Sequence, residues 1–219
     1  MGNNKSSFWM ALILTIIIFA IGFILGFFLE TYRSNSVEIN LMNSEINLLD
    51  EQVRQQVMGD FNVNCLDSKE STFNFANSIY TDAIRMEDYD RSTKFSDTLT
   101  LLHQRYDLLR MMLWDESVQI KKKCKSDFHT VVYVYEYNSE NLEKESKQKF
   151  FSNILLDLKN KYPNDILLIP MAGNTNLVSI NVTMKSYNVT DFPVIIIDEK
   201  KVLSNITTLN DLEKEVFGK

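Results

Sequence analysis

The C-terminal part of the chain contains the stretch Tyr187-Asn-Val-Thr-Asp-Phe-Pro-Val-Ile-Ile-Ile-Asp-Glu-Lys-Lys-Val-Leu203, which decides the predicted fold. Residues 194–197 are aliphatic and all β-branched, and residues 201–203 form a second short run, so both are predicted strands. The segment Asp198-Glu-Lys200 that separates them has the length of a tight hairpin turn. The stretch therefore predicts an antiparallel hairpin that begins directly after Pro193.

The segments around this hairpin complete an α/β domain over residues 127–219. Strands are indicated by β-branched, aromatic or fully apolar runs, and helices by apolar residues at helical spacing. The predicted elements are, in order, a strand at 130–137, a helix at 141–162, a strand at 165–170, a helix at 176–187, the two hairpin strands and a helix at 209–217. In this β-α-β-α-β-β-α order the first two strands, joined by a crossover helix, are expected to be parallel.

This order, together with a Tyr-x-Val turn, a proline and an apolar strand–turn–strand at 187–203, resembles the thioredoxin fold. In thioredoxin-like proteins the phrase carries a cis-proline that faces the active site, and Pro193 matches that position. The family's Cys-x-x-Cys motif opens the helix after the first strand, where it supplies a thiolate of low pKa and a resolving thiol. Here that region reads Asn138-Ser-Glu-Asn-Leu-Glu-Lys-Glu-Ser146 and contains no cysteine. We therefore expect the fold without the classical disulfide exchange.

The resemblance also implies a use that needs no sulfur. In the family the cis-proline loop offers backbone groups to an extended peptide, which makes Phe192 and Pro193 candidate peptide-binding residues by strand addition. The alternative is that Pro193 serves only the turn that the fold requires. No cofactor and no metal site are expected, because His103, predicted on a helix surface, and His129 have no Cys or His neighbour at ligand spacing.

Residues 60–126 are predicted to form a helical hairpin that precedes this domain. Periodic apolar residues indicate helices at about 68–89 and 94–122. The only two cysteines, Cys65 and Cys124, precede the first helix and end the second, so an antiparallel hairpin brings them to the same end. A disulfide is therefore predicted, which indicates an oxidising compartment. Two unrelated buried thiols are the alternative.

Residues 30–59 are predicted to form a juxtamembrane helix with a narrow apolar stripe. Its members recur at alternating steps of three and four: Ile39, Met42, Ile46, Leu49 and Val53. The stripe spans about two heptads, too short to establish a coiled coil by itself. A helix that packs on its own domain is the alternative.

Residues 8–29 are predicted to be a transmembrane helix that follows a short polar N-terminus at 1–7. The run contains no charge and a single hydroxyl, Thr15. At about 1.5 Å rise per residue it spans roughly 33 Å, enough to cross a hydrocarbon core of about 30 Å. A signal peptide usually has a shorter apolar core that ends in a small-x-small cleavage site, so a retained anchor is favoured.

A short polar N-terminus before a long apolar run is typical of a signal anchor, which leaves the N-terminus in the cytoplasm and the body outside. Lys5 and Arg33 flank the run about equally, so the distribution of Lys and Arg adds almost no bias. Gly22 and Gly26 form a Gly-x-x-x-Gly pair, through which two anchors can approach closely to give a homo-oligomer.

Composition narrows the function classes further. The 219 residues carry a formal net charge of −6, so no nucleic-acid partner is expected. No catalytic constellation is recognisable, and we predict a single-pass protein of the cell membrane that binds or scaffolds a protein or peptide outside the cytoplasm. The alternatives are a thiol-disulfide oxidoreductase relative in which Cys65 and Cys124 themselves cycle, and a cytoplasmic adaptor with both thiols reduced.

Overall fold

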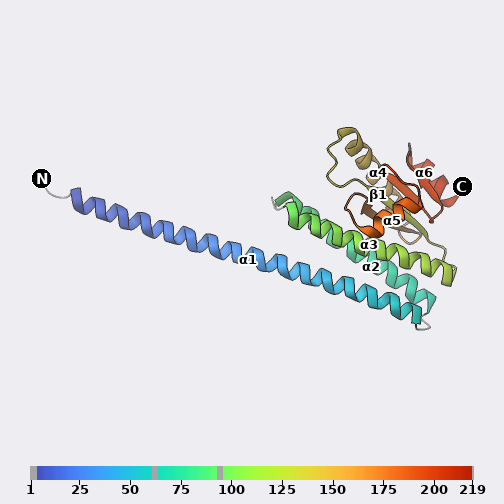
Figure 1. The fold of residues 1–219 in the computed structure, drawn as a ribbon, viewed down its shortest axis with the longest axis horizontal. Coiled ribbons are helices and arrows are strands. Elements are labelled where there is room, and N and C mark those ends of the chain that lie inside the picture. The colour runs from blue at the N-terminus through green and yellow to red at the C-terminus, as the bar shows by residue number, and fades with distance from the viewer. Residues whose placement is uncertain (1–3, 61–63, 93–95, 219) are drawn as a thin grey trace. The chain divides into compact units, whose positions relative to one another are not determined.

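The computed structural model of the chain describes residues 4–60, 64–92 and 96–218 (Figure 1). Residues 1–47 and residues 48–219 form two compact units. The elements are α1 (Asn4–Asp60), α2 (Cys65–Ser92), α3 (Ser96–Cys124), β1 (His129–Tyr135), α4 (Leu142–Lys161), β2 (Ile166–Ala172), α5 (Val178–Ser186), β3 (Val194–Ile197), β4 (Lys201–Leu203) and α6 (Leu209–Phe217). The predicted β-α-β-α-β-β-α order follows the two hairpin helices.

The first unit contains the apolar part of α1. Residues Phe8–Thr31 are helical, are exposed throughout, and are long and apolar enough to cross a membrane. Thr15 donates its hydroxyl to the carbonyl of Ala11 at 2.9 Å, so the one hydroxyl within the predicted span is satisfied by its own helix. Such internal pairing is what a helix surrounded by hydrocarbon requires. The predicted anchor and juxtamembrane helix are parts of one element, α1, in which no proline occurs.

The second unit is built on a four-stranded mixed sheet with the order β2-β1-β3-β4. β1 pairs in parallel with β2, with Val132 opposite Ile169, and antiparallel with β3, with Val132 opposite Ile196. β3 and β4 form the antiparallel hairpin. The mixed α/β class and the pairing directions expected from the sequence are therefore found.

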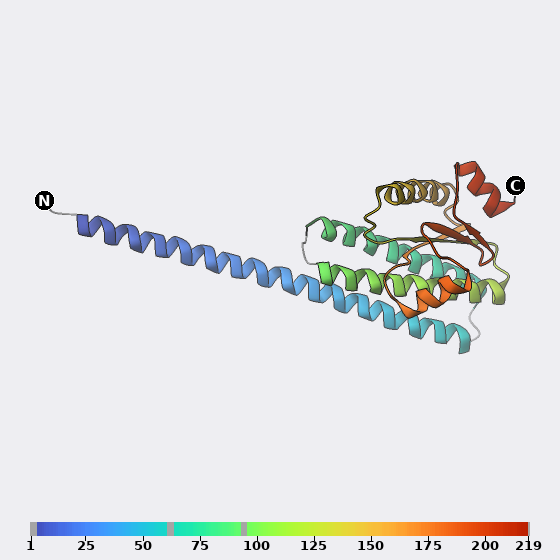
Figure 2. The same cartoon turned by 45° about the horizontal axis from the view of Figure 1, so that its top comes forward.

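Helices cover both faces of this sheet (Figure 2). Alternate residues of β1 point to opposite faces, so Val131 and Tyr133 pack with α4 and α6, whereas Val132 and Val134 pack with α2, α3 and α5. The hairpin α2–α3 is thus one layer of the same body as the sheet, a relationship that the sequence left open. Its core side chains include Ile79, Leu109 and Leu113.

Two local predictions about the hairpin were wrong. α2 begins at Cys65, before the predicted position near 68, because the side chain of Asn64 accepts a hydrogen bond from the N–H of Leu66 at 3.1 Å and caps the helix there. His103 does not lie on a helix surface. It is 9% exposed, and its ring centroid lies 4.0 Å from that of Tyr137.

Candidate functional site

The cis-proline end of the sheet lies where β1 ends and α4 begins. α4 begins there because the Asn141 side chain accepts hydrogen bonds from the backbone N–H groups of Glu143 and Lys144, at 3.0 and 3.1 Å. The peptide bond between Phe192 and Pro193 is cis, and Pro193 directly precedes β3. This end of the domain is the region in which the family resemblance would place a redox motif.

Charged side chains of Glu136, Lys144 and Asp191 form a network at this end, which we call the Lys144 network. The ammonium group of Lys144 lies 2.6 Å from a carboxylate oxygen of Glu136 and 2.9 Å from one of Asp191. The hydrogen bond from Lys144, with a second from the backbone of Phe192, holds the pKa of Asp191 below its ordinary value. The network therefore joins the end of β1, the first turn of α4 and the loop before Pro193.

Phe192 and Pro193 turn inward from the surface of this loop. Pro193 is buried, and Phe192 is half-buried with its ring packed over Gly173. A Cβ atom on Gly173 would overlap that ring, so the glycine is what allows the ring to lie there. Asp191 is exposed, as is Thr190 before it. A peptide at this position would meet Asp191 and backbone groups before it met the Phe192 ring.

The edge strand β2 is protected against strand addition. Ala172 donates its backbone N–H to the carboxylate of Asp107 on α3, at 3.1 Å. Two residues earlier on the same edge, Pro170 has no N–H to offer. Asp107 is fully buried and pairs with Arg110 at 3.2 Å, and burial raises the pKa of Asp107 although Arg110 opposes the shift. The opposite edge strand, β4, ends the sheet on the other side.

The structure joins Cys65 and Cys124 by a disulfide across a sequence separation of 59 residues, with the two Cα atoms 5.5 Å apart. Cys65 begins α2 and is exposed, whereas Cys124 ends α3 and is half-buried. Cys124 precedes the start of β1, and the Lys144 network begins after its end. Because each strand residue advances by about 3.3 Å, the length of β1 alone separates the two features by roughly 23 Å.

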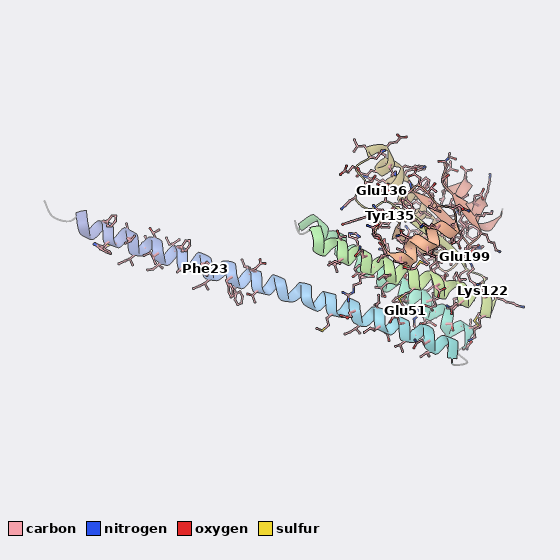
Figure 3. The ribbon with its side chains drawn as sticks, in the orientation of Figure 1. Phe23, Glu51, Lys122, Tyr135, Glu136 and Glu199 are labelled. Carbon is pink, nitrogen blue, oxygen red and sulfur yellow. A yellow bond between two sulfur atoms is a disulfide. The ribbon has the colours of Figure 1, made fainter. Side chains whose placement is uncertain are left out.

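A second polar cluster lies at the β3–β4 turn, at the opposite end of the sheet (Figure 3). Asp198 and Glu199 have φ angles of 48° and 58°, in the left-handed region that favours Gly or Asn. Lys121 of α3 lies 2.6 Å from Asp198 and 3.2 Å from Glu199, and His129 lies 2.6 Å from Asp198. The indole N–H of Trp114 donates to Glu199 at 3.0 Å. These contacts stabilise a turn in which Asp198 and Glu199 adopt a left-handed backbone conformation that their residue types disfavour.

The Asp198 carboxylate is stabilised by this cluster. Although burial acts to raise its pKa, hydrogen bonds from Lys121 and His129 hold the pKa of Asp198 below its ordinary value. Sequence reasoning missed the cluster because its members come from α3, the start of β1 and the hairpin turn. The available signal was a tight turn of Asp and Glu where Asn-Gly or Asp-Gly is usual.

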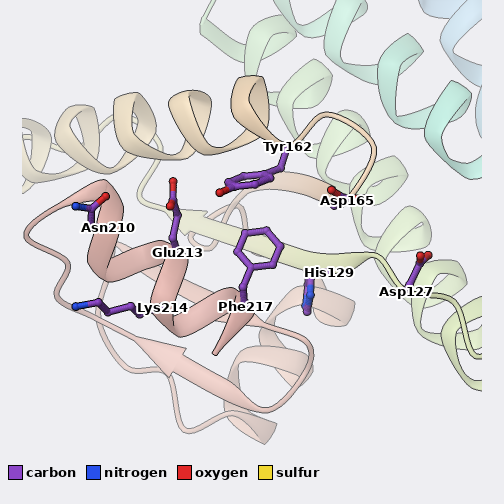
Figure 4. Close-up of a pocket in the computed structure, with 8 residues that line it drawn as sticks. All are labelled: Asp127, His129, Tyr162, Asp165, Asn210, Glu213, Lys214 and Phe217. Carbon is purple, nitrogen blue, oxygen red and sulfur yellow. The ribbon is translucent and has the colours of Figure 1, made fainter. Parts of the chain in front are cut away.

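Two hollows lie at the turn end of the sheet. The smaller, of about 510 Å³, lies between the end of α4, the start of β1 and α6 (Figure 4). Tyr162 and Phe217 form its apolar wall, with ring centroids 4.6 Å apart, and Glu213 on its rim pairs with Lys161 at 2.7 Å. The larger, of about 730 Å³, lies beside Trp114 and Lys121. Neither is lined by Phe192 or Pro193.

Within the described residues, no group of three or more His, Cys, Asp or Glu side chains is arranged to hold a metal ion. The carboxylates of Asp198 and Glu199 at the turn are instead engaged with Lys121, His129 and Trp114. The arrangement therefore favours contacts within the fold over a ligand-binding centre at this end.

Comparison with known proteins adds one weak likeness. No protein-family model matches the chain, and no curated protein matches it. Among solved structures, the chain is similar to thioredoxin O2 from Arabidopsis thaliana in its oxidized state, with a TM-score of 0.32 and 14% sequence identity over 48% of this chain and 87% of that one. A likeness of this size carries no argument about function.

Proposed function

We propose that this protein is a single-pass, membrane-anchored binding or scaffolding protein whose body is a redox-inactive thioredoxin-like domain outside the cytoplasm. The observation that carries the proposal is the Lys144 network. At the start of α4, where a thioredoxin-like enzyme needs a nucleophilic thiol, this chain has Glu136, Lys144 and Asp191 in ion pairs. Both cysteines are joined in a disulfide at the other end of the sheet.

The proposed location is supported by two features. Residues Phe8–Thr31 form an exposed apolar helix of membrane-spanning length, which suits a retained anchor. The disulfide suits an oxidising compartment. Together they favour a signal anchor with a cytoplasmic N-terminus and an extracytoplasmic body at the cell membrane.

The proposed partner is a protein or an extended peptide bound beside Phe192 and Pro193. Because Pro193 is buried and the Phe192 ring faces Gly173, recognition would depend on backbone groups and on the exposed Asp191. The alternating charges of the Lys144 network give the rim of this site polar specificity.

Insulin reduction tests the absence of redox activity. The full chain in lipid nanodiscs, supplied with dithiothreitol, should precipitate insulin no faster than dithiothreitol with empty nanodiscs. The Cys65→Ser/Cys124→Ser variant should give the same rate. A faster rate for the wild type that the variant abolishes would show that the protein is an oxidoreductase.

A second candidate function, thiol-disulfide exchange by Cys65 and Cys124, is favoured by one observation. Cys65 is exposed and is the first residue of α2, so an external thiolate can approach its half of the disulfide. The reduction potential of the pair decides between the roles. A value below about −300 mV indicates a structural bond, and a higher value indicates exchange chemistry.

Thiol labelling in intact cells tests the topology. A membrane-impermeant maleimide should label Cys65 and Cys124 only after treatment with an impermeant reductant. Labelling that requires permeabilised cells, without any reductant, would indicate the cytoplasmic adaptor instead.

A further inference from the structure

The C-terminal end of α1 belongs to the second unit and contacts α2 and α3 through one face of the helix. Glu51 is 1% exposed, and Arg54 donates to it with 2.7 Å between Nη2 and Oε1. Arg54 also donates to Ser71 of α2 at 3.0 Å and pairs with Glu116 of α3, while its guanidinium lies 5.2 Å from the centroid of the Phe75 ring. These contacts fix the rotation of this helical segment about its own axis.

The face on the other side of this segment is apolar and exposed. At 100° per residue, Leu49 and Val53 each lie about 160° around the helix from Glu51. Leu49 is 53% exposed, Val53 55% and Val57 39%. The same spacing continues in the sequence through Ile46, which is 56% exposed. The helix therefore packs on its own domain, as the alternative interpretation held, but through Leu48, Glu51 and Arg54 and not through the predicted stripe.

We propose that the apolar stripe of Met42, Ile46, Leu49 and Val53 is a seam that pairs with the same stripe of a second copy of the chain, with Val57 beside its end. Steps of three and four place two apolar residues in every seven. That seam is narrower than the band with which a helix docks on a globular core, and it suits knobs-into-holes pairing of two helices. Two copies anchored in one membrane present their seams in the same direction, so a parallel pair is self-complementary. The inference rests on the membrane anchoring proposed above.

The seam is too short to hold two soluble molecules together. Two heptads bury far less than the roughly 800 Å² per partner of a standard stable interface. Anchoring in a shared membrane raises the effective concentration of the second copy, which allows a weak contact to be occupied. Gly22 and Gly26 lie on the same helix, and a Cβ atom added to either would meet nothing within 4 Å, so the anchors can add a second contact.

The charges beside the seam distinguish a second copy from a basic partner. In a parallel pair the heptad spacing brings Glu45 of one copy near Asp50 of the other, and both are exposed acidic residues. Salt screens this repulsion, so higher ionic strength should strengthen the pairing of two copies. Contact between the same acidic edge and a basic partner would be weakened by salt.

Energy transfer between donor- and acceptor-labelled full chains in phosphatidylcholine vesicles tests the proposal. Transfer should increase with protein density and with salt. The Leu49→Glu/Val53→Glu variant should pair roughly 100-fold more weakly or worse, because four carboxylates would enter the seam. Val53→Glu alone and Gln52→Glu form the matched pair, since each adds one carboxylate per chain, the first in the seam and the second at an exposed position outside it. Only Val53→Glu should weaken pairing.

Further measurements distinguish a loss of pairing from a loss of folding and from a loss of membrane anchoring. Urea unfolding should show that the glutamate variant retains the fold, and Leu49→Ala/Val53→Ala provides a milder variant that should still weaken pairing. A wild type that floats with the vesicles yet gives no transfer overturns the seam. Transfer that survives both seam variants, or that only Gly22→Ile/Gly26→Ile abolishes, also overturns it. A wild type that does not float with the vesicles would instead contradict the anchoring.

Discussion

The guanidinium group of Arg54, near the end of α1, pairs with the carboxylate of Glu116 in α3, 62 residues further along the chain. Glu116 accepts a second hydrogen bond from the hydroxyl of Thr72 on α2, at 2.6 Å. Three helices therefore meet at one buried carboxylate. The end of α1 is held to the hairpin chiefly by polar contacts, and its stability should depend on them.

Replacing Arg54 with alanine should destabilise the second unit strongly. The substitution leaves Glu51 and Glu116 buried next to each other without their shared cation, and loss of one partner of a buried ion pair costs about 3–5 kcal/mol. Urea denaturation of the full chain measures the change. Lys201→Ala, which breaks the exposed pair with Glu215, is the control and should change the unfolding free energy by less than about 0.5 kcal/mol. Equal losses of unfolding free energy in the two variants would contradict the role of Arg54 as the cation shared by two buried carboxylates.

The unfolding free energy should decrease as pH rises toward 8 because of Glu51. Burial, assisted by Glu116 and opposed by Arg54, raises the pKa of Glu51 from 4.5 to about 8. The folded state therefore retains a proton that the unfolded chain releases above pH 4.5, and a state that binds more protons loses stability as pH increases. This contribution is complete below pH 4.5 and is lost as pH passes about 8.

Glu51→Gln supplies the comparison for this pH dependence. Glutamine has the shape of the protonated side chain and does not titrate, so the variant should show a flatter dependence between about pH 5 and pH 8. Denaturation curves of wild type and variant over that range measure the difference. Parallel curves would mean that Glu51 is ionised in the folded protein.

The disulfide should stabilise the folded hairpin because it restricts the conformations of the unfolded chain. Closing a loop across 59 residues lowers the entropy of the unfolded state and corresponds to about 4 kcal/mol in the chain-entropy model. Cys65→Ser/Cys124→Ser should lose stability of that order in urea. Wild type treated with reductant should lose the same amount, and a loss in only one of the two samples would point to an effect of the serines themselves.

Gly173→Ala should disturb the cis-proline end of the sheet. The new methyl group would overlap the ring of Phe192, and overpacking of this kind costs about 1–3 kcal/mol. Phe192→Ala removes the ring, so the double variant should lose less stability than the two single losses combined. A double-mutant cycle in urea gives this coupling energy, and strict additivity would mean that the ring does not lie over Gly173.

Much of the fold follows from local sequence. The strands at 194–197 and 201–203 and the helix at 209–217 have the predicted bounds, because β-branched runs and a capping Thr208 determine them locally. The meeting of Cys65 and Cys124 also follows from two consecutive helices of 28 and 29 residues that lie close together in sequence. These features depend on neighbouring residues or on simple counting along the chain.

The orientation of α1 could not be predicted in the same way. In sequence, Glu51 and Arg54 are an ordinary charged pair three residues apart on a helix, and Leu49 and Val53 form the obvious buried stripe. The structure reverses these roles because Ser71, Phe75 and Glu116 supply partners for Arg54. Those partners belong to other helices, so no local pattern indicates them.

The protected edge of β2 has a consequence for crowding. Copies of the chain that are anchored as proposed share a two-dimensional surface, where exposed strand edges meet often and can join into extended sheets. Pro170 and the bond from Ala172 to Asp107 leave β2 without the continuous row of free N–H groups that such joining needs. Neighbouring copies of the second unit can therefore collide at high density without joining into an open-ended sheet along this edge. Their association then depends on surfaces that accept only a limited number of copies.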